Sequence, residues 1–302
     1  MKKLLILVDS IGRKKESFVE LLTERVESSG IKITLARFSE ITADIAGKNI
    51  SIKVNDQDIK NFDLVYYRRV GDKFFSLGGT VAICLTHFGI PFYDTAFTDV
   101  GPDEDKFTNL TRLALAGLPV IPTFFCWHEK ISEHRDEIIK KFGLPLVAKS
   151  LGSHRGKGVY LLKNKEDFNL NKTEDEKTQF LFQKYKESDE EYRLLVLGDR
   201  VAVAEKKIRT DPNEFRSNVA LGAREEFLDV NKVPGEMREI AVKAAQTLKI
   251  QTAGVDIMVD KDGEWWLLEV NRGPGLTYDT KVSPEIDELA KFFKRELLKN
   301  DD

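Results

Sequence analysis

The sequence predicts an α/β protein in which an N-terminal domain with an open parallel sheet precedes two further α+β lobes. The first hundred residues alternate short apolar runs with segments of helical periodicity, a pattern typical of βαβ units. Beyond them, strands follow one another across glycine-rich turns. The chain has 302 residues, more than one compact core usually holds, so we expect two or three domains.

The N-terminal domain, residues 1–100, opens with a continuous apolar run at 4–8, as expected for a strand covered on both faces. Apolar residues then recur at helical spacing from Phe18 to Val26, and Ser28-Ser29-Gly30 ends this helix. The same patterns predict strands over residues 31–36, 62–67 and 90–93 and a helix over 81–88.

The rest of the chain divides into a small lobe, residues 101–185, and a C-terminal lobe, residues 186–302. Residues 118–125 are expected to be extended, and the polar run 163–177 to be a solvated connection. Helices are predicted over 107–117, 131–142, 236–248 and 284–298, strands over 144–149, 158–162, 179–185, 192–197 and 200–208, and a hairpin of 254–259 and 264–270 that turns at 260–263.

The composition excludes several classes of protein. Lysine and arginine total 47 against 50 aspartate and glutamate, so the net charge of −3 gives no global argument for binding nucleic acid or a membrane. Cys84 and Cys126 are too few for a disulfide framework or a four-ligand zinc site, and we expect both to be structural, in a reducing compartment. The apolar run that stops at Asp9 is too short for a signal peptide or membrane span, which predicts a cytoplasmic protein.

Two carboxylates on the last predicted hairpin carry the densest chemical signal. Asp256 and Glu269 are flanked by aliphatic residues, where a charge is costly unless it is paired or bound to a cation. A four-residue turn places them opposite each other, with Asn271 on the same face as Glu269. These hard oxygen ligands suit Mg²⁺. The alternative is a structural ion pair, for example with Arg193 or Arg216.

A glycine-rich segment follows the predicted strand that ends at Lys149. Its glycines, Gly152, Gly156 and Gly158, free backbone N–H groups that can wrap phosphate oxygens, and Lys149 supplies a point charge. The segment lacks the Gly-Lys-Ser/Thr of a Walker loop. A purely structural hairpin is the alternative, because tight turns need glycine in any case.

A third cluster is cationic and follows the strand over 200–208. Lys206, Lys207 and Arg209 precede Phe215-Arg216-Ser217-Asn218. Such a cluster could neutralise a transferring phosphoryl group. A solvated basic loop is the alternative.

Together these motifs resemble the ATP-grasp superfamily and, within it, the RimK-like branch of ribosomal-protein glutamate ligases. The resemblance runs from about Asp105 to Leu276, and the Phe-Arg-Ser-Asn element points to this branch. The motifs occur in the expected order: Asp105-Lys106, Pro145-Leu146-Val147-Ala148-Lys149, the glycine-rich segment, Phe182-Gln183-Lys184-Tyr185, Phe215-Arg216-Ser217-Asn218, Ala253-Gly254-Val255-Asp256, Leu268-Glu269-Val270-Asn271 and Gly273-Pro274-Gly275-Leu276.

The resemblance implies an ATP-grasp fold and a role for each matching residue. It implies that Lys106 and Lys149 contact ATP phosphates under the loop 152–158, and that an acid, best matched by Glu191 of the run 189–191, meets the ribose. It further implies that Gln183, Lys184 and Tyr185 lie along the adenine edge, that Asp256, Glu269 and Asn271 hold Mg²⁺ (with Mn²⁺ as an alternative ion), and that Arg216 and Asn218, with Lys149, serve catalysis beside the transferring phosphate.

Two arginines stand outside the family pattern. Arg272 follows Asn271 where the family usually has a small residue, and it either selects an acidic acceptor or substrate or pairs with a nearby acid. Arg69 ends a strand of the first domain, at the edge where open α/β sheets present ligands, so we expect it to help hold a carboxylate substrate. The sequence after Asn218 also departs from the family, which weakens any transfer of substrate identity.

The function implied by the resemblance is an ATP- and Mg²⁺-dependent carboxylate–amine ligase that works through an acyl phosphate. Its substrates would be an amino-acid or peptide carboxylate and an amine, on a protein, peptide or small acceptor, with glutamate as a candidate donor. The alternatives are an amino-acid-biosynthetic or glutathione-type ligase, and a catalytically silent ATP-binding module. The joint presence of Lys106, Lys149, Asp256, Glu269 and Asn271 argues against the silent module.

Overall fold

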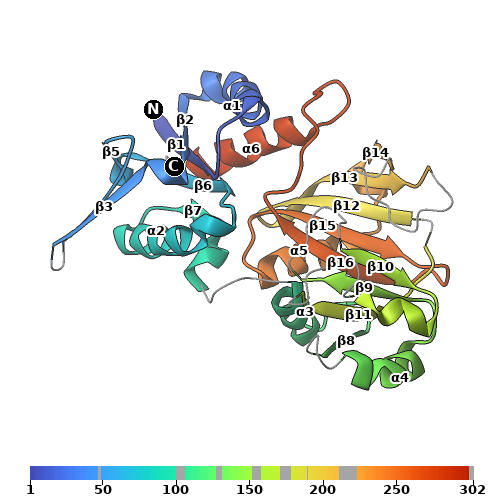
Figure 1. The fold of residues 1–302 in the computed structure, drawn as a ribbon. Coiled ribbons are helices and arrows are strands. Elements are labelled where there is room, and N and C mark those ends of the chain that lie inside the picture. Colours follow the sequence, from blue (N-terminus) through green and yellow to red (C-terminus); the bar gives the residue numbers. More distant parts are fainter. Residues whose placement is uncertain are drawn as a thin grey trace.

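The computed structural model describes residues 1–46, 49–99, 106–126, 131–151, 158–170, 178–188, 190–210 and 223–298. Over these residues the fold contains a parallel N-terminal sheet, two antiparallel sheets in the rest of the chain and a small three-stranded arm. Figure 1 shows the N-terminal domain beside the large sheet of β12 to β16, with the small sheet of β8 to β11 next to it. No helix in this described part is long and apolar enough to cross a membrane.

The N-terminal domain is an open parallel sheet, as predicted. Its strands lie in the order β2-β1-β6-β7, and their apolar residues are buried because helices cover both faces. The strands are β1 (Lys2–Val8), β2 (Ile31–Arg37), β6 (Leu64–Arg69) and β7 (Phe92–Tyr93), and the helices between them are α1 (Arg13–Val26) and α2 (Phe75–Phe88).

An antiparallel arm between β2 and β6 was not predicted. It consists of β3 (Ile41–Ala46), β4 (Asn49–Val54) and β5 (Gln57–Asp58), and it projects from the sheet in Figure 1. Asn55 and Asp56, between β4 and β5, both have positive φ angles, 47° and 61°. An Asn-Asp pair after an alternating strand is a hairpin signal that could have found the arm.

The small lobe is a four-stranded sheet packed on one helix. Its order is β10-β9-β11-β8, and α4 (Ile131–Phe142) buries Ile138 and Phe142 against it. Helix α3 (Lys106–Leu115) precedes this sheet and packs instead against the large one, through Leu113. The strands are β8 (Thr123–Cys126), β9 (Leu146–Ser150), β10 (Val159–Leu162) and β11 (Phe180–Lys184).

The large sheet has five antiparallel strands in the order β14-β13-β12-β15-β16. Helix α5 (Gly235–Thr247) covers one face, where Ala241, Ala244 and Ala245 are fully buried. The edge strand β14 was not predicted, because its sequence is largely charged. The strands are β12 (Glu190–Leu197), β13 (Arg200–Ile208), β14 (Arg224–Leu228), β15 (Thr252–Val259) and β16 (Trp265–Arg272).

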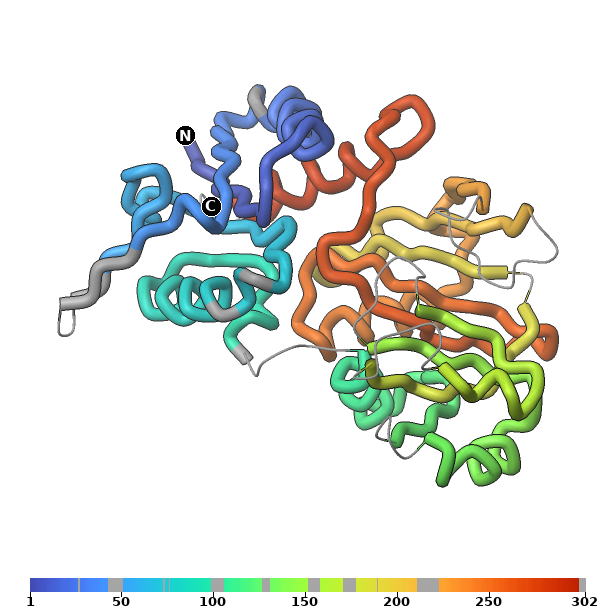
Figure 2. The backbone as a smooth tube through the Cα atoms, in the orientation of Figure 1, coloured from blue at the N-terminus to red at the C-terminus, as the bar shows by residue number. Residues whose placement is uncertain are grey.

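The C-terminal helix returns to the N-terminal domain. Helix α6 (Glu285–Leu298) packs on α1, and Phe292 and Phe293 are buried in the same core as Leu4 and Ile6 of β1. Figure 2 shows this red segment beside the blue start of the chain. The unit predicted over residues 186–302 therefore places its last helix in the core of the first domain. The two cysteines are buried and free, and burial raises the pKa of both thiols.

Candidate active site

The face of the large sheet that lies away from α5 carries charged residues in register. Paired residues on neighbouring strands share a face, and residues two apart on one strand also share it. The face away from α5 therefore presents two rows of side chains. One row is Glu205, Arg193, Asp256 and Glu269, on β13, β12, β15 and β16; the second is Glu225, Lys207 and Glu191, on β14, β13 and β12.

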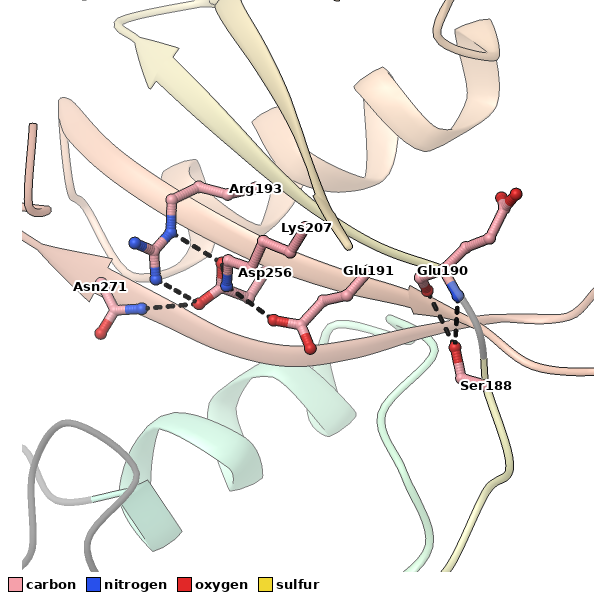
Figure 3. Close-up of polar contacts among 7 residues, drawn as sticks. All are labelled: Ser188, Glu190, Glu191, Arg193, Lys207, Asp256 and Asn271. Carbon is pink, nitrogen blue, oxygen red and sulfur yellow. Dashed lines mark hydrogen bonds and ion pairs between the residues drawn. The ribbon is translucent and has the colours of Figure 1, made fainter. Parts of the chain in front are cut away.

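Asp256 is the centre of this face and is buried. The predicted register is confirmed, since Asp256 pairs with Glu269 across the hairpin. Arg193 donates from Nε and Nη2 to the two carboxylate oxygens, each at 2.9 Å. Lys207 Nζ lies 3.1 Å from Asp256 Oδ1, and Asn271 Nδ2 donates to Oδ2 at 3.1 Å. Figure 3 shows these three side chains converging on Asp256.

The electrostatics of Asp256 follow from these partners. Burial alone would raise its pKa, but Arg193 and Lys207 outweigh burial and hold the pKa at about 2. The ion pair with Arg193, one of the two sequence-based alternatives, is therefore present. A carboxylate has about four lone-pair sites, and these four donors fill them. A cation that binds Asp256 must displace one donor.

Glu191 lies next to Asp256 on the same face and is also largely buried. Lys207 Nζ donates to Glu191 Oε1 at 2.6 Å, so one ammonium bridges two carboxylates (Figure 3). Burial raises the pKa of Glu191, and Lys207 opposes this. At the start of the same strand, Ser188 Oγ accepts from the Glu190 amide at 3.1 Å and caps the strand end.

The small lobe brings two predicted lysines toward these carboxylates. Lys149 is on β9, where burial lowers the pKa of its ammonium while the charges of Glu269 and Glu191 oppose that effect. Lys106, at the start of α3, donates from Nζ to the Ser150 carbonyl at 2.9 Å. The fold therefore joins Lys106, Lys149 and the Asp256 cluster, which the sequence places far apart.

The residues predicted along the adenine edge lie at the end of β11. Gln183 is buried, and its Nε2 donates to Thr123 Oγ1 at 2.8 Å. Within the described residues, Gln183 Oε1 has no hydrogen-bond partner. Lys184 is exposed and Tyr185 is half-buried. An orphaned buried acceptor fits a ligand that brings an N–H donor, as an adenine amino group does.

Several predicted residues lie outside the described part of the chain. They are Gly152 and Gly156 of the glycine-rich segment, Arg216 and Asn218 of the Phe-Arg-Ser-Asn element, and Asp189 of the acidic run. Gly158 is described and stands directly before β10 with a φ of +70°. A positive φ favours glycine at this position.

The two arginines outside the family pattern have different surroundings. Arg272 pairs with an acid, since its Nε lies 3.5 Å from Asp94 Oδ2, and its guanidinium lies 4.4 Å from the Phe97 ring centre. Asp94 is fully buried and also accepts from the Gln251 amide at 3.0 Å. Arg272 is therefore engaged between the N-terminal domain and the large sheet.

Arg69 Nε lies 3.6 Å from Asp9 Oδ2. The Arg69 side chain is half-exposed, so it remains accessible to a substrate. Its neighbour Arg68 is buried and donates to the Pro274 carbonyl at 2.9 Å. At Gly273 (φ +54°), a Cβ would lie 2.3 Å from the Arg68 carbonyl oxygen. Glycine is required there because the backbones approach so closely.

Sequence reasoning missed two parts of the charged face. Arg193 entered only as a candidate partner of the carboxylates, and Glu205 did not enter at all. Glu205 is two residues before Lys207, within the strand predicted over 200–208. Alternation along that strand would have placed both on one face, which is the signal that could have found Glu205.

The oxygen atoms and lysines gathered at this site fit a nucleotide with a bound magnesium ion. Carboxylate oxygens of Asp256 and Glu269 lie across one hairpin, and Asn271 donates its Nδ2, which directs its oxygen away from Asp256. Hard oxygen donors of this kind suit Mg²⁺, and the lysines of the small lobe suit phosphate. Among the described residues, no group of three or more His, Cys, Asp or Glu side chains is arranged to hold a metal ion. Mg²⁺ at this face would accordingly keep water and phosphate ligands.

Comparison with known proteins agrees with this geometry. A family model described as the RimK-like ATP-grasp domain matches residues 103–292. The probable alpha-L-glutamate ligase of Nitrosococcus oceani is 28% identical over 261 residues, 84% of this chain and 83% of that protein.

Two solved structures of the ATP-grasp ligase PsnB are similar over almost the whole chain. The complex with minimal precursor has a TM-score of 0.71 at 21% identity, and covers 96% of this chain and 99% of PsnB. The complex with a phosphomimetic variant of minimal precursor, Mg and ADP has a TM-score of 0.70 at 19% identity, and covers 97% of this chain and 99% of PsnB. This likeness confirms the predicted fold class.

Proposed function

The chain belongs to the RimK-like ATP-grasp family, and we propose that it is an ATP- and Mg²⁺-dependent ligase that joins a carboxylate to an amine through an acyl phosphate. The observation that carries this proposal is the meeting of opposite charges from two lobes. Lys149 of the small lobe interacts electrostatically with Glu269, Glu191 and Asp256 of the large sheet. Lys106 Nζ donates to the carbonyl of Ser150, the residue that follows Lys149. A nucleotide with its metal needs both signs within a few ångströms.

The chain's own residues supply positioning and charge in this reaction. Lys106 and Lys149 would bind phosphate oxygens, and Lys149 would offset the charge that spreads over the transferring phosphoryl group. Asp256, Glu269 and Asn271 would hold Mg²⁺. When bound, Mg²⁺ would neutralise phosphate charge and orient the phosphates. Arg193 keeps Asp256 ionised and fixed in place.

The substrate carboxylate would be held where the first domain meets the large sheet. Arg69 lies at the carboxyl end of β6, and Arg68 contacts the loop that follows β16. A half-exposed guanidinium beside Asp9 can bind a carboxylate by charge-assisted hydrogen bonds. We infer that Arg216 and Asn218 act at the transferring phosphate, and that glutamate or another amino acid is the donor. Support for the donor comes from the relative described as a probable glutamate ligase.

The acceptor is proposed to be an amine on a protein, peptide or small molecule. A further PsnB structure is a complex with the precursor peptide PsnA2, which supports a peptide acceptor. Mass spectrometry of a cell lysate incubated with the protein and ATP would identify the acceptor from one mass increment. A gain equal to one or more amino-acid residues on a polypeptide is the expected result, and a gain on small amines alone would favour the small-molecule ligase.

Phosphate release tests the ligase against a silent nucleotide-binding module. ATP and Mg²⁺ are supplied with each amino acid in turn, with hydroxylamine present to trap the acyl phosphate. We expect at least one carboxylate to stimulate release, and Lys149→Met to lower the rate by about 100-fold. Lys163→Met, at an exposed position after β10, is the matched control and should keep the wild-type rate. Bound ATP without carboxylate-dependent release would contradict the proposal.

A further inference from the structure

Glu205 is a buried carboxylate whose neighbours leave it unsatisfied. Its side chain is on the charged face of β13, and the residue is only 4% exposed. Within the described residues, its Oε1 has no hydrogen-bond partner. A buried acceptor without a donor costs free energy, so such a group in a native site points to a ligand that supplies the donor.

The two cations whose charges act on Glu205, Arg193 and Lys207, form hydrogen bonds with other carboxylates. Arg193 lies directly across on β12, but its Nε and Nη2 bind Asp256. Lys207, two residues along β13, binds Glu191 and Asp256. The carboxylate of Glu205 is therefore available to bind a further cation, and it adjoins the cluster proposed to hold Mg²⁺.

Two further carboxylates, those of Glu225 and Glu285, act on Glu205 through their charge, and both accept hydrogen bonds. Thr277 donates its amide to Glu285 Oε2 at 2.7 Å and its hydroxyl to Glu225 Oε2 at 3.2 Å. Glu285 also accepts from Ser283 Oγ at 3.0 Å. Burial and the charge of Glu225 raise the pKa of Glu205 to about 7, with Glu285 adding to the rise and Arg193 and Lys207 opposing it. Repulsion among three carboxylates is relieved when a cation enters.

We propose that Glu205, flanked by Glu225 and Glu285, is the subsite that binds the acceptor's primary ammonium group and takes its proton. This inference rests on the proposed ligase function. An ammonium offers the donor that Glu205 Oε1 lacks and the positive charge that the three carboxylates require. A hydroxyl offers only the donor. The subsite therefore selects an amine over an alcohol, and the product is an amide rather than an ester.

Amide formation begins when Glu205 removes one proton from the acceptor. The acceptor gives one proton from R–NH₃⁺ to Glu205 and becomes a free amine. The nitrogen lone pair then attacks the acyl carbon, and the C–N bond forms as the C–O bond to phosphate breaks. The phosphate departs with that bonding pair and takes the second nitrogen proton. Glu205 later releases its proton to solvent. A base whose pKa lies near the working pH suits this task.

Binding of a simple probe tests the subsite without requiring turnover. n-Butylammonium chloride and n-butanol share a carbon skeleton and differ in the group that Glu205 would recognise. Thermal unfolding of the full chain is followed as each probe is added, with sodium chloride to match ionic strength. We expect a saturable rise in Tm with butylammonium only. Glu205→Gln should raise its half-saturating concentration by about 10-fold or more.

Glu226→Gln is the matched control, since Glu226 is on the same edge of the sheet but on the opposite face of β14 and is exposed. It should respond as the wild type does. A second measurement uses the wild type alone: between pH 6 and 8 the probe remains a cation, as a lysine amine does, so its binding should tighten by about 10-fold as Glu205 ionises. Equal responses to butanol and butylammonium, or pH-independent binding, would overturn the proposal.

The trapping reaction separates this proposal from the proposed function. Hydroxylamine is already neutral near pH 7 and needs no proton acceptor. With a carboxylate that supports turnover, Glu205→Gln should keep hydroxamate formation close to the wild-type rate but lower amide formation by about 100-fold. Equal loss of both products would exclude the role in proton transfer. If the wild type gives no hydroxamate with any carboxylate, the ligase function fails, while the butylammonium titration still decides whether the ammonium subsite exists.

Discussion

One face of the large sheet has an apolar end, which packs against the N-terminal domain, and a charged end, which forms the candidate site. On β12, Leu195 and Leu197 are buried in the core of the N-terminal domain. Arg193 and Glu191 continue the same face of the same strand, yet they contact Asp256 and Lys207. The apolar end fixes the first domain to the sheet by burial, whereas the charged end depends on each ion having the correct partner. Removal of a side chain should therefore have different consequences at the two ends.

The largest effect is expected for Asp256→Asn at the charged end. This change leaves Arg193 and Lys207 buried beside a neutral amide, which should lower the free energy of unfolding by about 3–5 kcal/mol and abolish turnover. Urea denaturation and phosphate release would measure the two losses. Asp262→Asn, in the exposed turn of the same hairpin, should change neither. Full stability of Asp256→Asn would show that the ion cluster contributes little to the fold.

A loss of similar size, but of stability alone, is expected at the apolar end. Leu197 is fully buried in the shared core, so Leu197→Ala should cost about 2–5 kcal/mol through lost burial and a cavity. Below the unfolding transition, the rate of phosphate release per folded molecule should stay at the wild-type value. A reduced rate in fully folded protein would mean that the two ends are coupled more closely than their contacts indicate.

An intermediate effect is expected in the pH dependence of stability. The pKa of Glu205 is raised to about 7 in the folded protein, from an ordinary value near 4.5. Between these values the unfolded chain has already lost the proton that the folded chain keeps. The free energy of unfolding should therefore fall as the pH rises through this window, by up to about 3 kcal/mol from this group.

Urea denaturation at pH 5, 6, 7 and 8 would measure this slope. Glu205→Gln removes the titrating group, so its stability should fall less between pH 5 and 8 than that of the wild type. Glu226→Gln should keep the wild-type slope, because Glu226 is exposed on the opposite face. Identical slopes for all three proteins would show that Glu205 does not titrate in this window.

The smallest effect on stability is expected for Glu269→Gln. Glu269 is opposite Asp256 but exposed, and surface substitutions usually change the free energy of unfolding by about 0.5 kcal/mol or less. Its activity should nevertheless fall by about 100-fold, with a higher Mg²⁺ requirement, because a proposed metal ligand is lost. Phosphate release over a range of Mg²⁺ concentrations would measure this. An unchanged Mg²⁺ requirement would remove Glu269 from the metal site.

The hairpin of β15 and β16 is the part of the site that could be predicted best. Alternation and a short turn place Asp256 opposite Glu269, and the structure has this register. The donors around Asp256 were harder to predict, since β12 and β13 lie about 50 to 60 residues earlier in the chain. Arg193 could be named only as one candidate partner, because a carboxylate on a strand can pair with any cation that the sheet order brings beside it.

Local patterns in the sequence were enough to place most of the helices and strands, the order of the motifs and the pairing of Asp256 with Glu269. These depend on periodicity and turn chemistry, which act over a few residues. Contacts between distant segments of the chain, by contrast, establish that Arg193 and Lys207 neutralise Asp256, that Glu205 keeps an unsatisfied oxygen, and that α6 completes the first domain. The physical reason is that these contacts depend on the strand order β14-β13-β12-β15-β16 and on which apolar faces meet, and both are settled by the packing of residues far apart in the chain.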